Sequence, residues 1–190
     1  MRTATRSCRV CNKAIEENSW RSVVFGGEHI CQDCYYELKP RYAPMEIAGL
    51  KGFTLYAKSD KLNGILHSFL KGNDKKLGPV LFSYAAKIFY IRYHGYTIVP
   101  LPENDFDGDF LPAKEIFGPF RFKVVDPFVE DVIEEGENIR VHTHIKRGIS
   151  LGEKVMLFGM KPNAKEVEKA AKLLRKNGAK TLICFFLSEA

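Results

Sequence analysis

The sequence lacks any apolar run near the roughly 18 residues that a membrane-spanning helix needs. Its first residues, MRTATRSCRVCN, contain no hydrophobic stretch typical of a secretory signal. It also lacks a P-loop, a GxSxG elbow and a cysteine–histidine nucleophile pair, and it has no internal repeats. These absences argue against a membrane protein and the common hydrolase classes. They predict a cytoplasmic chain without membrane insertion.

Hydrophobic residues make up 45% of the 190 residues and charged residues 27%, an ordinary globular mixture. The net charge of +6 is unevenly distributed. Residues 51–102 carry eight Lys/Arg against two Asp/Glu, and residues 141–190 carry ten against four. The segment between them, 103–140, carries four against eleven. Such basic blocks fit either a solvated surface or a face for a polyanion, such as nucleic acid or a phosphorylated ligand.

Four of the five cysteines form two CxxC pairs, separated by 19 residues: Cys8 with Cys11, and Cys31 with Cys34. Two such pairs complete a tetrahedral shell of four thiolates, and their spacing is typical of a structural zinc site. A module of about 45 residues has little core of its own, so a metal would stabilise it. Two disulfides or a redox CxxC are alternatives that fit the cytoplasm less well. We expect structural zinc, with no open position for catalysis.

Two domains are expected, a zinc ribbon over residues 1–45 and an α/β domain over residues 46–190, with a proline-marked linker at 39–44. Hydrophobic periodicity predicts strands at 53–58 and 96–101 and helices at 62–70 and 77–93. For residues 103–140 we expect loops, a short strand near 122–125 and a helical turn around 127–133. We expect two parallel strands at 154–158 and 181–187, because both segments are apolar runs. A helix from Asn163 to Gly178 should join them.

Four segments carry a resemblance to a known family: the two cysteine pairs, Phe69-Leu70-Lys71-Gly72-Asn73-Asp74, Val99-Pro100-Leu101-Pro102, and Gly178-Ala179 before the last strand. In order and spacing the chain resembles the ComF competence family, in which a zinc ribbon is joined to a type I phosphoribosyltransferase fold. The resemblance implies a Rossmann-like α/β domain. It also implies a role in the uptake or processing of transforming single-stranded DNA, with a competence helicase as partner.

The family's phosphoribosyl-pyrophosphate loop consists of a hydrophobic strand, two acidic residues and Thr-Thr-Gly. Here the strand is followed by seven other residues, Gly159, Met160, Lys161, Pro162, Asn163, Ala164 and Lys165. The acidic pair would accept hydrogen bonds from the ribose hydroxyls, and it is missing. Except for Pro162, these residues are the candidate phosphate-binding positions, because they surround the start of a predicted helix.

The resemblance therefore implies a non-catalytic binding or adaptor protein. One alternative is an active phosphoribosyltransferase of nucleotide salvage, with Mg²⁺ as cofactor and a divergent loop. A second alternative is a zinc-ribbon module that binds a protein partner without contacting DNA.

A second candidate surface lies at residues 140–147, which alternate as a strand does. This alternation places Arg140, His142, His144 and Lys146 on one face, with Arg147 next to them. We interpret these five residues as a possible contact for phosphate or nucleic acid, with a plain exposed strand as the alternative.

Overall fold

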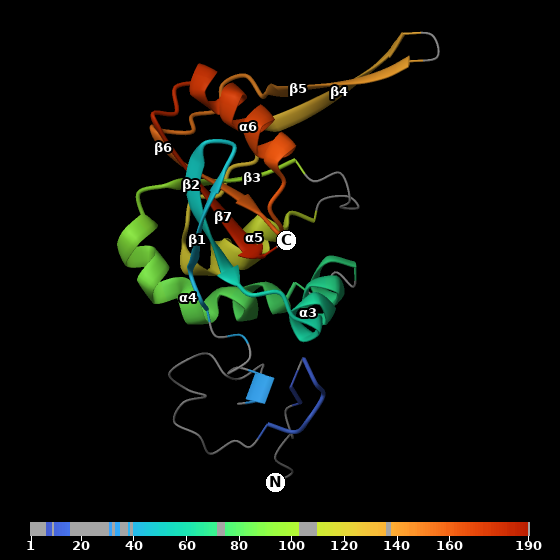
Figure 1. Ribbon diagram of the computed structural model, residues 1–190, viewed down its shortest axis with the longest axis vertical. Helices are drawn as coiled ribbons and strands as arrows, with labels where there is room; N and C mark the ends of the chain where they lie inside the picture. Colours follow the sequence, from blue (N-terminus) through green and yellow to red (C-terminus); the bar gives the residue numbers. More distant parts are fainter. Residues whose placement is uncertain are drawn as a thin grey trace.

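The computed structural model describes residues 7–8, 10–15, 31, 33–34, 38, 40–71, 75–102, 110–135 and 138–189. For Tyr84 and for residues 132–135 and 138–142 it describes the backbone alone. One sheet forms the centre of the molecule, with strands in the order β1-β2-β7-β6-β3 (Figure 1). These strands are β1 (Ala43–Ile47), β2 (Leu50–Tyr56), β7 (Thr181–Ser188), β6 (Lys154–Gly159) and β3 (Thr97–Pro100). The last four pair in parallel, and β1 pairs antiparallel with β2.

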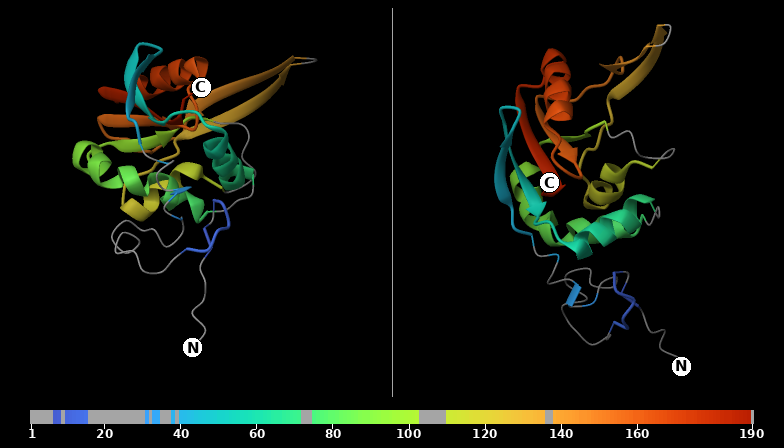
Figure 2. Two further views of the ribbon diagram at one scale, coloured as in Figure 1. Left: turned by 60° about the horizontal axis from the view of Figure 1, so that its bottom comes forward. Right: turned by 45° about the vertical axis from the view of Figure 1, so that its right-hand side comes forward.

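Helices cover both faces of this sheet. One face packs against α3 (Asp60–Lys71), α4 (Leu77–Tyr93) and α5 (Pro112–Phe117), the last continued by the short η1 (Gly118–Phe120). The other face packs against α6 (Ala164–Lys176), as the two views in Figure 2 show. The expected mixed α/β fold is therefore confirmed. None of the helices that the structure describes is long and apolar enough to span a bilayer.

Each face of the sheet has its own apolar core. On the α4 side, phenylalanines dominate, and Phe82, Phe89, Phe117 and Phe185 are fully or almost fully buried. On the α6 side the core is smaller, and α6 contributes Val167, Ala170, Ala171 and Leu174 to it. The apolar positions of α6 recur at helical spacing, so the sequence places one face of that helix on the sheet.

Strands β1 and β2 are joined by a two-residue turn. Both turn residues are left-handed, with φ of 50° at Ala48 and 72° at Gly49, as a type I′ hairpin requires. This hairpin lies at the edge of the sheet and contains Pro44, which has no N–H to donate. The predicted linker at 39–44 is wrong in its last two residues, which belong to β1. A proline in an edge strand costs no ladder hydrogen bond, and so it does not end the strand.

A second sheet consists of only two strands, β4 (Phe128–Glu135) and β5 (Asn138–Ile145), which pair antiparallel over their whole length. This ribbon projects away from the rest of the molecule (Figure 2). The helical turn predicted around 127–133 is wrong, because these residues form β4. Their partner strand lies farther along the chain, and a local pattern contains no information about it. The short strand expected near 122–125 is reduced to a single bridge between Val124 and Ile98.

Candidate functional site

The four cysteines of the two CxxC pairs lie together. Their Sγ atoms are all within 4.8 Å of one another, and the Sγ atoms of Cys11 and Cys31 are 3.5 Å apart. A tetrahedral shell with metal–sulfur bonds of about 2.3 Å would hold its sulfurs about 3.8 Å apart. All four thiols are free of disulfides. They are therefore close enough to bind a metal ion such as zinc, and their donor set fits that ion.

Backbone hydrogen bonds shape the first cysteine pair. The N–H of Cys8 donates to the carbonyl of Lys13, and the N–H of Asn12 donates to the carbonyl of Cys8, each over 2.7 Å. Asn12 is left-handed, with φ of 58°, which closes the turn so that both thiols face the same side. Cys8 and Cys34 are buried in the apolar core next to Leu38. The centre is thus continuous with the packing of the α/β part.

The environment of the thiols differs from one to the next. Burial opposes ionisation of Cys8, but the backbone N–H groups of Cys31, Cys11 and Val10 outweigh it and lower the pKa of that thiol to about 7. Burial, reinforced at Cys34 by the neighbouring thiols, raises the pKa of Cys31 and Cys34 above the usual value. The Cys8 thiolate therefore forms readily without a metal, whereas Cys31 and Cys34 need a cation nearby to ionise.

A crevice lies at the carboxyl ends of β3 and β6, with a volume of about 630 Å³. After β3, the chain passes through α5 to the segment around Val124, which pairs with β3 on the side away from β6. After β6, the chain passes through α6 to β7, which lies on the side of β6 away from β3. Crossovers of opposite direction leave a gap at the strand ends, where open α/β sheets bind ligands. The ribbon of β4 and β5 and the start of α5 close the sides of this crevice.

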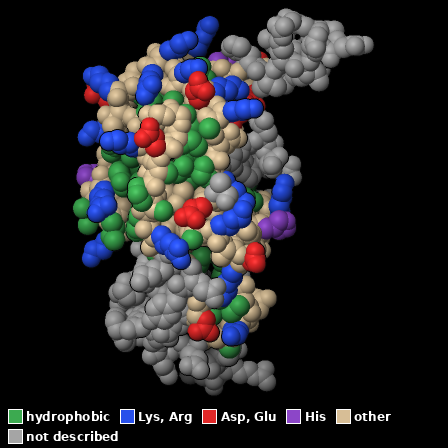
Figure 3. Space-filling model, in the orientation of Figure 1, with side chains coloured by type: hydrophobic (Ala, Val, Ile, Leu, Met, Phe, Trp, Pro, Cys, Tyr) green, Lys and Arg blue, Asp and Glu red, His purple; other side chains and the backbone are tan. Residues whose placement is uncertain are grey.

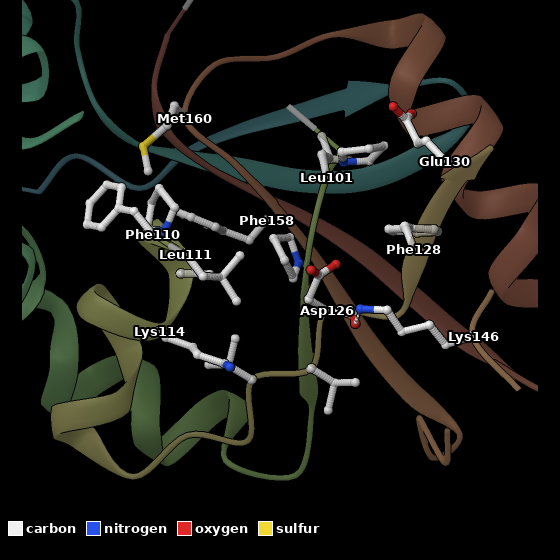
Figure 4. Close-up of a pocket in the computed structure, with 16 residues that line it drawn as sticks. Leu101, Phe110, Leu111, Lys114, Asp126, Phe128, Glu130, Lys146, Phe158 and Met160 are labelled. Carbon is white, nitrogen blue, oxygen red and sulfur yellow. Dashed lines mark hydrogen bonds between the residues drawn. The ribbon is translucent and has the colours of Figure 1, made fainter. Parts of the chain in front are cut away.

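The floor of the crevice is apolar and its walls carry four charges. Figure 4 shows the floor as the side chains of Leu101, Phe110, Leu111, Phe128, Phe158 and Met160. The charged groups are Lys114 from α5, Asp126 before β4, Glu130 of β4 and Lys146 after β5. The Lys146 ammonium donates to the carbonyl of Asp126 over 3.4 Å. In Figure 4 the Asp126 carboxylate points into the space between Phe158 and Leu101.

Glu130 is tied to other groups. Its Oε1 accepts a hydrogen bond from the Thr143 hydroxyl over 3.1 Å and lies 4.0 Å from the ammonium of Lys169 on α6. Asp126, in contrast, accepts the hydrogen bond from Lys146 through its backbone carbonyl and not through its carboxylate. Of the two carboxylates, Asp126 is therefore the one available to a ligand in the crevice.

The structure divides the candidate phosphate positions between two places. Met160 lines the crevice, and Gly159 ends β6 between Leu101 and Phe186, where an added Cβ would lie 3.1 Å from either side chain. The other four, Lys161, Asn163, Ala164 and Lys165, are exposed at the start of α6. Asn163 caps that helix, since its Oδ1 accepts the N–H of Glu166 over 3.4 Å.

The second candidate surface is also divided. Lys146 belongs to the crevice, and Arg147 is exposed beyond it. His144 lies 3.2 Å from the Asp131 carboxylate on the neighbouring strand. Arg140 and His142 belong to β5, but their side chains lie outside the described part of the chain.

Sequence reasoning missed most of the crevice, including Lys114, Asp126 and Phe128. The strand end Val99-Pro100-Leu101-Pro102 was the available signal, because it marks the carboxyl end of a buried parallel strand. Neither a protein-family model nor a curated protein matches the chain.

Proposed function

We propose that the chain is a type I phosphoribosyltransferase-like protein of the ComF type that binds its ligand without transferring a phosphoribosyl group. We also propose that the metal in its cysteine centre is zinc with a structural role. The resemblance suggests an adaptor that handles transforming single-stranded DNA together with a competence helicase. The order of elements supports this assignment: a cysteine module, then β3 ending in Val99-Pro100-Leu101-Pro102, then a ribbon, and last the β6–α6–β7 unit.

One observation carries the proposal of binding without transfer: the apolar end of β6. Phe158 and Met160 are buried to all but 2% and 6%, and both line the crevice where the family has acidic residues nearby. Gly159 between them has no side chain and no room for one. Ribose hydroxyls would thus find no carboxylate on this wall. Each lost charged hydrogen bond costs about 1.5–3 kcal/mol, so two together cost on the order of 10² to 10⁴ in affinity or rate.

Titration calorimetry with phosphoribosyl pyrophosphate and Mg²⁺ tests this proposal. We expect no magnesium-dependent binding by the unaltered protein. Met160→Asp would restore one acceptor, worth about tenfold or more in affinity, and should bring magnesium-dependent binding toward the measurable range, whereas the matched variant Met160→Leu should show no binding. Gly159→Asp is unsuitable, because its Cβ would press on Leu101 and Phe186. Tight, magnesium-dependent binding by the unaltered protein would contradict the proposal.

The phosphoribosyltransferase alternative is favoured by one observation, the Asp126 carboxylate directed into the crevice (Figure 4). A carboxylate on the opposite wall could take over the contact with a ribose hydroxyl. If so, the unaltered protein would release pyrophosphate in the presence of Mg²⁺ and an acceptor base. Asp126→Asn would then abolish the release, while Glu130→Gln would change it less because Glu130 is already engaged by Thr143.

A further inference from the structure

An apolar cluster is exposed on α4. Ile88, Tyr90 and Ile91 are the large hydrophobic residues that the described part of the chain leaves most exposed, at 46%, 49% and 68%. All three lie within one turn of the helix, where Ile91 stands between Ile88 and Tyr90 and the three together cover roughly 160° of its circumference. The opposite side of the same helix is already buried in the core through Phe82, Ala85 and Phe89, so packing within the chain does not explain the three exposed residues. Exposed apolar residues that gather in one place mark interaction sites.

This cluster is surrounded by positive charge. Lys87 and Arg92 flank it on α4, and the Tyr90 ring lies 5.6 Å from the ring of Phe122, whose chain neighbours are Arg121 and Lys123. Residues 77–102 and 116–125 contain these four Lys/Arg and no Asp or Glu. Figure 3 shows hydrophobic and Lys/Arg side chains interleaved along the left-hand rim, over α4. Among the described residues, Lys87 and Arg121 have no ion-pair partner.

The basic helix α6 is different. Lys172 on it lies 2.7 Å from Glu168, and Lys180 beyond its end lies 2.5 Å from Glu153, although Lys165, Arg175 and Lys176 have no ion-pair partner among the described residues. Its sequence contains no aromatic residue. The α4 surface therefore combines unneutralised cations with exposed rings, and α6 does not.

The exposed rings on α4 are already stacked. Tyr90 and His94 lie 5.5 Å apart with an angle of 26° between their planes, and Nδ1 of His94 lies 3.1 Å from the carbonyl oxygen of Tyr90. Both residues are exposed at the carboxyl end of the helix. A pair held in this way offers a ring face on which a nucleobase can stack.

We infer that this surface, formed by Lys87, Ile88, Tyr90, Ile91, His94 and Arg121, binds single-stranded nucleic acid. Bases stack on the Tyr90–His94 pair, Ile91 extends the apolar contact, and Lys87 and Arg121 neutralise phosphates. The inference rests on the proposed function, since it names the surface that handles the strand. A second copy of the chain fits less well, because two faces with the same uncompensated positive charge repel each other.

The location of the surface separates it from the crevice. Helix α4 ends just before β3 begins, whereas the crevice lies at the other end of that strand. Substitutions on the α4 surface therefore leave the crevice residues in place, and ligand binding there can be measured independently.

Fluorescence anisotropy with a labelled oligodeoxythymidylate, longer than the roughly 4–16 nucleotides that one such site covers, tests the inference. We expect Tyr90→Ala to weaken binding about tenfold and Tyr90→Phe, which keeps the ring, to have little effect. Lys87→Glu combined with Arg121→Glu should make the dependence of log affinity on log salt shallower by about 1.4, or about 0.7 for each phosphate that is no longer neutralised. Arg175→Glu with Lys176→Glu on α6, two exposed residues outside both candidate sites, is the matched control, with the same change in net charge.

Three results would overturn the inference. If the unaltered protein binds the oligonucleotide and Tyr90→Ala binds it equally well, the surface is wrong while the proposed function stands. If the unaltered protein does not bind it at all, the inference and the DNA-handling part of the proposed function both fail. If sedimentation shows a dimer that Ile91→Lys dissociates, the surface is an interface between copies instead. Thermal unfolding of each variant confirms that it is folded.

Discussion

The first turn of α4 rests directly on the backbone of α5, because a Cβ added at Gly78 would lie 2.6 Å from the carbonyl oxygen of Glu115. No other residue type permits this approach. Lys75, just before the helix, lies 3.7 Å from the Glu115 carboxylate and adds a weak ion pair at the same contact. Since α5 also supplies Ala113 and Lys114 to the crevice, Gly78 positions one of its walls.

Gly78→Ala should therefore destabilise the protein by about 1–3 kcal/mol, because the two helices must move apart. The matched control is Gly64→Ala in the middle of α3, where an added Cβ meets nothing within 4 Å. There alanine should raise the free energy of unfolding by about 0.5–1 kcal/mol, since it favours the helix. Urea denaturation followed by circular dichroism measures both. Equal effects of the same sign would show that Gly78 has no special role.

Phe82 lies at the centre of a group of aromatic rings in the larger core. It is fully buried, and its centroid lies 4.7–6.4 Å from those of five other rings, Phe89, Phe117, Phe120, Phe122 and Phe185. Phe82→Ala should lower the free energy of unfolding by about 3–5 kcal/mol, through reduced burial and a cavity that the neighbouring rings cannot fill. Phe82→Leu should cost less. A loss below about 1 kcal/mol for the alanine variant would be incompatible with this packing.

The turn between β1 and β2 contains a residue, Ala48, whose replacement should stabilise the protein. Ala48 has a φ of 50°, which costs an alanine about 1 kcal/mol relative to a residue that tolerates this region. Ala48→Asn should therefore stabilise the protein by about 0.5–1 kcal/mol. Gly49→Ala should destabilise it by a similar amount, because φ is 72° there. Thermal unfolding measures the melting temperature of both variants. A lower melting temperature for Ala48→Asn than for the unaltered protein would disprove the turn geometry.

The cysteine centre predicts one zinc ion per chain. Protein purified under reducing conditions should contain it by elemental analysis, and Cys31→Ser should lower the affinity sharply by removing one of four ligands. Cys184→Ser is the matched control. The Cys184 thiol is fully buried in β7 and belongs to the core on the α6 side of the sheet, not to the four-cysteine cluster, and burial raises its pKa to about 12. Zinc lost equally from both variants, or absent from the unaltered protein, would contradict the assignment.

Zinc affinity should fall steeply with acidity. The pKa values of Cys31 and Cys34 are raised, so both thiols are protonated at neutral pH in the metal-free protein and must release their protons on binding. These two released protons alone make the affinity fall by at least about 100-fold for each pH unit of acidification. The pKa of Cys8, about 7, adds further loss once the pH falls below that value. Competition with a chromophoric chelator at several pH values measures the slope.

Most of the core elements were predictable from the sequence, and the crevice was not. Helix α4 begins and ends at the predicted residues, and the β6–α6–β7 unit differs by a residue or so at its ends, because apolar periodicity and a capping Asn163 mark these elements locally. Strand β4 was missed because its stability comes from pairing with β5. Asp126 reaches the crevice only because Val124 pairs with Ile98, a contact between distant parts of the chain.

The proline in β1 also sets how far the sheet can grow. In the hairpin, Ile47 and Leu50 close the turn, so backbone groups of alternate residues, among them Pro44, face away from β2. A further strand arriving at this edge would find a carbonyl at Pro44 but no donor. The edge thus resists templating a neighbour's strand, which protects a sheet with four parallel strands from growing chain by chain into an aggregate.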